Sequence, residues 1–215
     1  MSFAARVTDL TSHGVPLAPG PGSPTVLIGG LPAWRALPSG IGGAIEAVSN
    51  TMQSFMSSPL LTPANASGQL AQIQSGLMQA AAAAASQGNP AGVAAATSAA
   101  VLLNTTNIAL TAAWTAGCAV PGGQPAANIA YTLGIQAAAA GASASVFSSV
   151  AGMTDTHVCP IPCPIPPHGP GMVTRGSQTV IISGLPAVRQ GDQVFEAAGG
   201  SNPVAMGCPT VIIGD

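Results

Sequence analysis

The side chains that could bind a metal ion or act as nucleophiles are few in this sequence. They are three histidines and four cysteines: His13, His157, His168, Cys118, Cys159, Cys163 and Cys208. The sequence has no HExxH motif and no pair of CxxC motifs, so spacing along the chain alone is weak evidence for zinc. No Ser–His–Asp arrangement, Cys–His arrangement or phosphate-binding loop stands out. Any metal site must therefore be assembled by the fold.

A repeat predicts how the fold assembles it. GSPTVLIGGLPAWR begins at Gly22, GSQTVIISGLPAVR at Gly176, and the truncated GCPTVIIGD at Gly207. Each copy predicts a strand of four or five residues that ends at glycine, and its nearly continuous apolar run predicts that both faces are covered. A unit this small cannot bury its own apolar face. Three units packed around one axis, forming a three-sided β prism, are expected.

The repeat also relates the candidate ligands to one another. His13 precedes Gly22 by nine residues and His168 precedes Gly176 by eight, while Cys208 begins the third strand. If the copies close around one axis, these positions converge at one end. Four nitrogen or sulfur ligands there would form a closed tetrahedral zinc site, which is structural rather than catalytic.

Other roles for these residues remain open at this stage. A lone histidine in a loop is more often an exposed side chain without any ligand role. Cys159 or Cys163 could replace a zinc ligand, or the two could form a disulfide after export.

Charge is distributed very unevenly along the chain. The chain has no lysine, and its four arginines are too few and too scattered for a nucleic-acid interface. Residues 36–154 contain one charged residue, Glu46, and the flanks contain all the others. Since soluble domains usually have about a quarter of their residues charged, something other than water is expected to cover the central part.

The central part reads as four helical segments separated by proline and glycine, at about 42–57, 64–87, 91–119 and 126–152. The last two exceed the roughly 20 residues that span a bilayer, although Ala, Thr and Ser dominate them. Two interpretations compete for this insert. It is either a membrane hairpin that turns at residues 121–125, or a helical bundle covered by its own assembly or by a partner protein.

Arginine and aspartate recur beside the repeat. Arg6 and Asp9 are three residues apart, as are Arg189 and Asp192, whereas Arg35 is followed by the insert. Removing residues 36–154 brings Asp155 close to Arg35 in the chain. We interpret these residues as ion pairs that stabilise turns, and the insert as placed between an arginine and its aspartate.

The segments LPAWR, LPAVRQGD, DTHVCP and PPHGPG, with the three GxxTV(L/I)I strands, resemble the PAAR-repeat proteins. These proteins cap the spike of type VI secretion systems and related contractile injection machines. The resemblance covers roughly residues 3–35 and 155–215. In addition, AARVTDLTSHG at Ala4–Gly14 resembles the prePAAR motif, found where hydrophobic helices interrupt the domain. Trp34 and Gln178 depart from the usual motif, which has Ala and Pro there, and both are expected to be tolerated.

The resemblance implies a mainly β conical three-sided prism interrupted by an Ala-rich α-helical insert. Residues 1–35 and 155–215 would form the cone, and residues 36–154 the insert. The family's zinc site has three histidines and one cysteine. Transferred to this sequence, the ligands of one structural Zn²⁺ are His13, His157, His168 and Cys208.

The implied function is mechanical. The protein would sharpen the tip of a trimeric VgrG-type spike and connect it to an effector, an Eag-type chaperone or the target membrane, without acting as an enzyme. The sequence MSFAARVTDL is not a secretory signal, so synthesis in the cytoplasm and export by the injection machine are expected. The alternatives are a zinc-dependent toxin or enzyme delivered by the same machine, and an ordinary small membrane protein.

Overall fold

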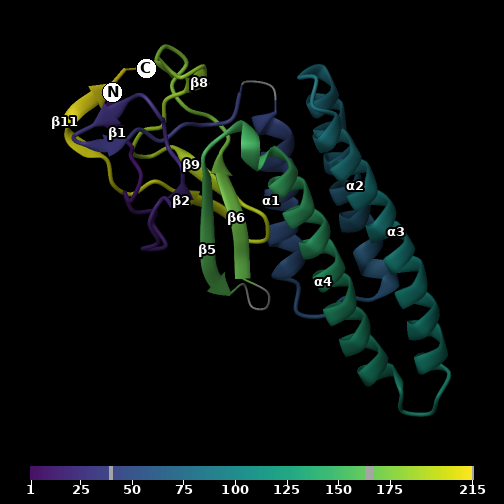
Figure 1. Ribbon diagram of the computed structural model, residues 1–215. Helices are drawn as coiled ribbons and strands as arrows, with labels where there is room; N and C mark the ends of the chain where they lie inside the picture. The colour runs from purple at the N-terminus through teal and green to yellow at the C-terminus, as the bar shows by residue number, and fades with distance from the viewer. Residues whose placement is uncertain (39–40, 163–166, 215) are drawn as a thin grey trace.

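The computed structural model describes residues 1–38, 41–162 and 167–214, and it combines a β-rich part with four long helices (Figure 1). Both termini lie in the β-rich part, at the end away from the helices. The helices are α1 (Gly42–Met56), α2 (Pro63–Ser86), α3 (Pro90–Cys118) and α4 (Gln124–Val150), followed by one 3-10 turn at Ala151–Met153. The four predicted helical segments are confirmed.

The strands are short and form four small sheets. They are β1 (Ser2–Ala4), β2 (Pro19–Gly20), β3 (Leu27–Ile28), β4 (Leu31–Pro32), β5 (Thr156–Pro162), β6 (Pro167–Val173), β7 (Ile181–Ile182), β8 (Leu185–Pro186), β9 (Gln193–Glu196), β10 (Gly200–Pro203) and β11 (Cys208–Ile213). The largest sheet is antiparallel with the order β10-β9-β6-β5-β2, and the other pairs are β1-β11, β3-β4 and β7-β8. In the described residues no sheet closes, and helices dominate, so the fold is mixed α and β rather than mainly β.

The first two repeat copies form tight hairpins. β3 turns into β4 through Gly29 and Gly30, and β7 turns into β8 through Ser183 and Gly184. All four turn residues have positive φ, between 51° and 84°, which is the backbone conformation of two-residue hairpin turns. The strands on either side are only two residues long, shorter than predicted, while the third copy forms the longer strand β11.

The repeat strands are covered on one face only. The last residue of each TV(L/I)I run, Ile28, Ile182 or Ile213, is 5–7% exposed, whereas the residue before it is 56–63% exposed. These exposed positions are Leu27, Ile181 and Ile212. The prediction that both faces are covered is therefore wrong for the described structure, because the runs alternate in and out as strands with one solvent face do.

The three copies are joined in a closed ring of backbone hydrogen bonds. Ala5 N donates to Val188 O (2.8 Å), Val188 N to Trp34 O (3.0 Å), and Trp34 N to Ala5 O (2.9 Å). Each residue precedes the arginine of its copy. Every copy thus contacts the other two in the same way around a pseudo-threefold axis.

Each arginine of the repeat is clamped by an aspartate. Asp9 Oδ2 accepts a hydrogen bond from Arg6 N (2.8 Å), and its Oδ1 accepts one from Arg6 Nη2 (2.8 Å). Asp192 binds the backbone and the guanidinium of Arg189 in the same way, at 2.8 and 3.0 Å. The predicted ion pairs are present, and each also satisfies a backbone N–H at the turn.

The third clamp spans the insert. Asp155 binds Arg35 N (2.8 Å) and Arg35 Nη2 (2.7 Å) although the two residues are 120 positions apart. Thr154 Oγ1 also donates to Arg35 O (2.8 Å), so the chain enters and leaves the insert at one point. The hydrogen bond to fully buried Asp155 raises the pKa of Arg35. The insert does lie between an arginine and its aspartate.

Proline and side-chain caps define where the helices start. Pro63 and Pro90 occupy the first positions of α2 and α3, where a missing N–H costs nothing. Thr62 and Asn65 form a reciprocal capping box on α2, and the Asn89 side chain accepts from Gly92 N on α3.

The helical insert shares a core with the β-rich part instead of only projecting from it. Side chains of α1, α2 and α4 form one buried cluster with Met172, Phe195, Ala197 and Ala198. Buried hydroxyls support this contact, because Ser49 Oγ donates to Glu196 O (2.7 Å) and Ser143 Oγ to Ala197 O (2.6 Å). Helices α1 and α4 therefore pack against the β9–β10 hairpin and hydrogen-bond to its backbone.

Among the described residues, two helices have the length and apolar composition of a membrane span. They are Pro90–Cys118 and Gln124–Met153, whose most apolar windows are 17% and 50% buried. A core helix passes the same test, and half of the second window is already buried. Helix α3 is the more exposed of the two, with Val101, Leu102 and Ile108 each more than half exposed.

Replacing Arg35 tests the clamp around the insert. Arg35→Ala leaves the buried Asp155 carboxylate without its charged partner, which is expected to lower the free energy of unfolding by about 3–5 kcal/mol. The matched control is Arg175→Ala, since Arg175 is 76% exposed in its pair with Glu46. Urea denaturation of both variants measures the difference, and equal small losses would show that the clamp contributes little.

Trp34 provides a second test of the β core. Its side chain is fully buried, and its indole N–H has no hydrogen-bond partner within the part of the chain that the structure describes. Trp34→Ala should cost about 3–5 kcal/mol through the cavity it leaves. Trp34→Phe removes the unpartnered N–H together with part of the volume, so it is expected to stay within about 1.5 kcal/mol of the parent. A Phe variant as unstable as the Ala variant in urea would contradict this account.

Candidate metal centre

Four side chains that can ligate a metal meet inside the β-rich part. The ligand atoms of His13, Cys159, His168 and Glu196 all lie within 4.8 Å of one another. His13 lies in the amino-terminal flank, Cys159 on β5, His168 on β6, and Glu196 at the end of β9. The group is thus drawn from segments on both sides of the helical insert.

Strand register explains how these side chains converge. His157 and Cys159 are two residues apart on β5 and are both buried, while Val158 between them is exposed. β6 pairs with β5 on one side and with β9 on the other, and Gly171 lies opposite both His157 and Glu196. Because side chains two apart share a face of a strand, His157 and Cys159 face the same interior.

Glycine provides the space around His168 and Glu196. A Cβ atom at Gly199 would collide with the His168 ring and with Glu196 Oε2, and one at Gly171 would lie 3.0 Å from Glu196 Cγ. Both glycines have ordinary backbone angles, so space rather than backbone conformation requires them. The pocket around the two side chains is therefore built into the backbone.

The distances within the group are short. Cys159 Sγ lies 3.5 Å from His13 Nδ1 and 3.7 Å from His168 Nδ1. The carboxylate of Glu196 lies between the imidazoles, with Oε2 2.6 Å from His168 Nδ1 and Oε1 3.4 Å from His13 Nδ1.

The orientation of the His157 ring is fixed by a hydrogen bond to the backbone. Its Nδ1 lies 2.9 Å from Pro16 O, and because a carbonyl only accepts, Nδ1 carries the proton. Its Nε2 is buried, has no hydrogen-bond partner among the described residues, and lies 3.6 Å from Glu196 Oε1. A histidine with one nitrogen held by a carbonyl and the other unpartnered is typical of a metal ligand. The residues present therefore fit a metal ion.

Burial and charge set the protonation of the two acidic members. Burial alone would raise the pKa of Glu196, but the approach of His157, the Asn202 amide and the charges of His13 and His168 together lower it. Burial raises the pKa of Cys159 to about 11, so without a metal it is a neutral thiol. A metal ion bound by this sulfur would displace its proton.

The structure places the predicted cysteine ligand elsewhere. Cys208 begins β11, which pairs with β1, and its sulfur lies 3.3 Å from Thr210 Oγ1 and faces Gly29. It belongs to a separate core cluster with Ile28, Ile182 and Ile213. The three predicted histidines are brought together but Cys208 is not, because it lies among the repeat hairpins. Cys159 replaces it as the thiol of the group.

Of the remaining cysteines, Cys163 lies outside the described residues and Cys118 ends helix α3. Sequence reasoning gave Cys159 only a possible role and did not include Glu196. The His157-Val158-Cys159 alternation was a usable signal, because it puts both ligand types on one strand face. Glu196 stands in a short run of apolar residues, where a carboxylate is uncommon unless it is paired.

The donor set favours zinc. Imidazole nitrogen with a thiolate suits a tetrahedral Zn²⁺, whereas oxygen-rich sites suit calcium or magnesium. The fold is thus built on a three-copy β repeat, and it brings together a group of side chains that could hold a metal ion.

Comparison with known families identifies the motif in the carboxy-terminal repeat copies. Residues 165–215 match the family model described as PAAR motif, which covers His168, Glu196 and the last two repeat copies. The carboxy-terminal part of the chain therefore carries a PAAR motif, and this motif suggests a spike-tip role in contractile injection systems. No curated protein and no solved structure matches the chain.

Exchange of single cysteines tests the thiol. Cys159→Ser is expected to weaken zinc binding by more than about tenfold, because outer-sphere changes alone cost 10–100-fold. Cys208→Ser should keep the zinc content of the parent protein, and it serves as the matched control. Metal analysis and competition with a chromophoric chelator measure both. Loss of zinc from the Cys208 variant only would restore the ligand set predicted from the sequence.

Proposed function

We propose that this protein caps and sharpens the trimeric spike of a type VI secretion or related contractile injection system. The observation that carries the proposal is the PAAR motif match together with the closed ring of hydrogen bonds among three equivalent segments. A single chain with pseudo-threefold symmetry can present similar contacts to each subunit of a trimer. The ring and the three Arg–Asp clamps support a conical, three-sided arrangement of the copies.

A zinc ion would be held by His13, His157, His168 and Cys159. The free Nε2 of His157 supports its inclusion, and the three histidines are those expected from the prePAAR resemblance. Bound zinc would supply charge and fixed geometry only. It would connect the amino-terminal flank, through His13, to strands β5 and β6 beyond the insert, and so stabilise a domain with a small core.

Spike docking is best supported at the repeat strands. Leu27, Ile181 and Ile212 are equivalent in the three copies and all largely exposed. Apolar side chains repeated in this way match a threefold partner, and the scarcity of charge favours apolar and backbone contacts over ion pairs.

Helices α3 and α4 are the part of the insert best suited to a second partner. Neither carries a charged residue, and α3 leaves much of its apolar surface uncovered. We assign this hairpin to contact with an Eag-type chaperone or an effector before firing, and with the target membrane afterwards. Under this proposal the domains are 1–35 and 155–215 for the cone and 36–154 for the insert, and the protein is secreted by the machine.

A zinc-dependent toxin or enzyme is the second candidate, because Glu196 lies beside the ligands, where a catalytic base would be needed. Three observations weigh against it. Glu196 is fully buried, its two oxygens accept from His168 and Asn202, and a thiolate would close the zinc shell.

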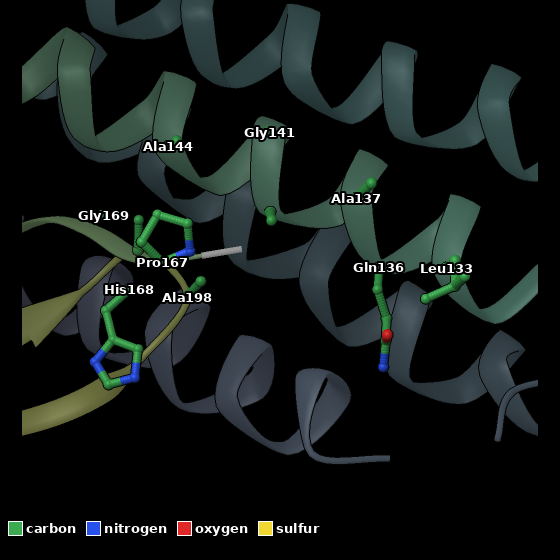
Figure 2. Close-up of a pocket in the computed structure, with 11 residues that line it drawn as sticks. Leu133, Gln136, Ala137, Gly141, Ala144, Pro167, His168, Gly169 and Ala198 are labelled. Carbon is green, nitrogen blue, oxygen red and sulfur yellow. The ribbon is translucent and has the colours of Figure 1, made fainter. Parts of the chain in front are cut away.

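The adjacent cavity gives the enzyme little support. An apolar cavity of about 470 Å³ lies between α4 and residues 167–169 and 197–198, with His168 at one end and Leu133 and Gln136 at the other (Figure 2). Among the described residues that line it, His168 is the only titratable side chain. A water molecule on the metal in a zinc-loaded crystal structure, with Glu196 free to accept its proton, would favour the enzyme.

Copurification with the spike trimer tests the main proposal. The combined substitutions Leu27→Asp, Ile181→Asp and Ile212→Asp put three charges into an apolar contact, so spike affinity should fall at least tenfold while zinc content stays unchanged. The matched control places Asp at Val101, Leu102 and Ile108 on α3, which should leave spike binding unchanged. Parent-like spike binding by the first variant would overturn the assignment of this surface.

A further inference from the structure

We propose that Asn202 is the positioning residue of the metal centre. Its side-chain amide holds the Glu196 carboxylate with the NH₂ group and holds the Ser12–His13 segment with the oxygen. This inference rests on the proposed zinc site and extends it to two residues, Asn202 and Ser12, that would not touch the ion. Its consequence is that the amino-terminal flank and the carboxylate are oriented together by one buried side chain.

The contacts of Asn202 are all directed at the site. Asn202 Nδ2 donates to Glu196 Oε1 at 2.7 Å. Its Oδ1 accepts from Ser12 Oγ at 2.8 Å and from His13 N at 3.2 Å. Asn202 and Glu196 are both fully buried, so water does not compete for the bond between them. The orientation of the amide is fixed by its partners, because the reversed amide would place its oxygen against a carboxylate.

Backbone pairing brings the amide to this place. Asn202 lies on β10 opposite Val194 of β9, which separates β10 from β6, and its neighbour Pro203 accepts from Ser12 N at 2.8 Å. Thr11 forms an isolated bridge with Val204. The amino-terminal flank therefore lies along β10, and Asn202 is the side chain that points from this strand to both the flank and Glu196.

The hydrogen bonds form one continuous path. It runs from Ser12 to Asn202, from Asn202 to Glu196, and from Glu196 to His168 Nδ1 at 2.6 Å. His13, the most exposed of the histidines, is held by its own backbone N–H to the same amide oxygen. Since outer-sphere hydrogen bonds orient metal ligands, Asn202 sets the relative positions of His13 and His168.

Asn202→Asp removes the donor and keeps the acceptor. The new carboxylate would face Glu196, so this contact becomes repulsive while Ser12 and His13 keep their acceptor. We expect zinc affinity to fall about 10–100-fold. The absorption spectrum of the Co²⁺-loaded protein, which reports ligand geometry, should also change. The matched control is Asn128→Asp in helix α4, where Oδ1 accepts from Trp114 Nε1 on α3.

A double exchange tests the hydrogen bond itself. Asn202→Asp combined with Glu196→Gln keeps the total charge and lets the new amide donate to the new carboxylate. The double variant should recover at least half of the lost affinity on a logarithmic scale and a Co²⁺ spectrum closer to that of the parent. A merely structural asparagine would lower thermal stability in both variants but leave zinc affinity and the Co²⁺ spectrum unchanged.

Ser12→Ala serves if the buried variants do not fold. Ser12 is exposed, so its replacement leaves the core intact and removes one hydrogen bond to Asn202. Zinc affinity should fall about 2–10-fold, as expected for one lost hydrogen bond.

The two proposals fail in distinguishable ways. If the parent protein binds zinc and both Asn202→Asp and Ser12→Ala bind it equally well, the role of Asn202 is overturned and the zinc site stands. If the Asn202 variant does not fold, parent-like zinc binding by Ser12→Ala overturns that role. If the parent protein takes up neither zinc nor Co²⁺, the zinc site and the role of Asn202 are both overturned.

Discussion

A ring of three backbone hydrogen bonds is the contact on which the other features of the β-rich part depend. It joins Ala5, Trp34 and Val188, which are far apart in the sequence but occupy the same position in each repeat copy. One core layer lies on either side of it. The isoleucines of the repeat strands pack on one side, and Leu17, Val173, Val194 and Val204 pack with the ring residues on the other. Without the ring, each of these two layers would be covered by packed residues on one side only.

The metal centre depends on the second of these layers. Val173 and Val194 lie on β6 and β9, the strands that carry His168 and Glu196, so packing against the ring fixes where these strands run. The ring also holds the amino-terminal flank, which supplies His13. Residues on the two sides of a helical insert of more than a hundred positions can therefore meet within hydrogen-bond distance.

Several features could be predicted from the sequence because they depend on local spacing. Proline and glycine mark the four helices, and the Arg–Asp pairs follow from their position in the repeat. Repeat equivalence predicts that the loops of His13 and His168 converge, and His157 was added only from the family resemblance. Repeat equivalence does not indicate at which end of a copy a side chain lies, so it cannot decide between Cys208 and Cys159.

Other features depend on contacts that no local pattern encodes. Glu196 is held by Asn202 and by strand register, and the shared core between α1 and β9–β10 arises only after the chain has folded back on itself. The open outer face of the repeat strands was missed for a similar reason. A run of four apolar residues looks the same whether one face or both faces are covered.

The clamp formed by Arg35 and Asp155 also affects how such a protein can evolve. Because the chain leaves and re-enters the β-rich part at one stapled point, the geometry of the ring does not depend on the length of what lies between. Insertions succeed where the two ends are close and the host backbone is already satisfied. The position after Arg35 can thus accept helical modules of different length, provided that their helices still cover Met172, Phe195 and Ala198 as α1 and α4 do.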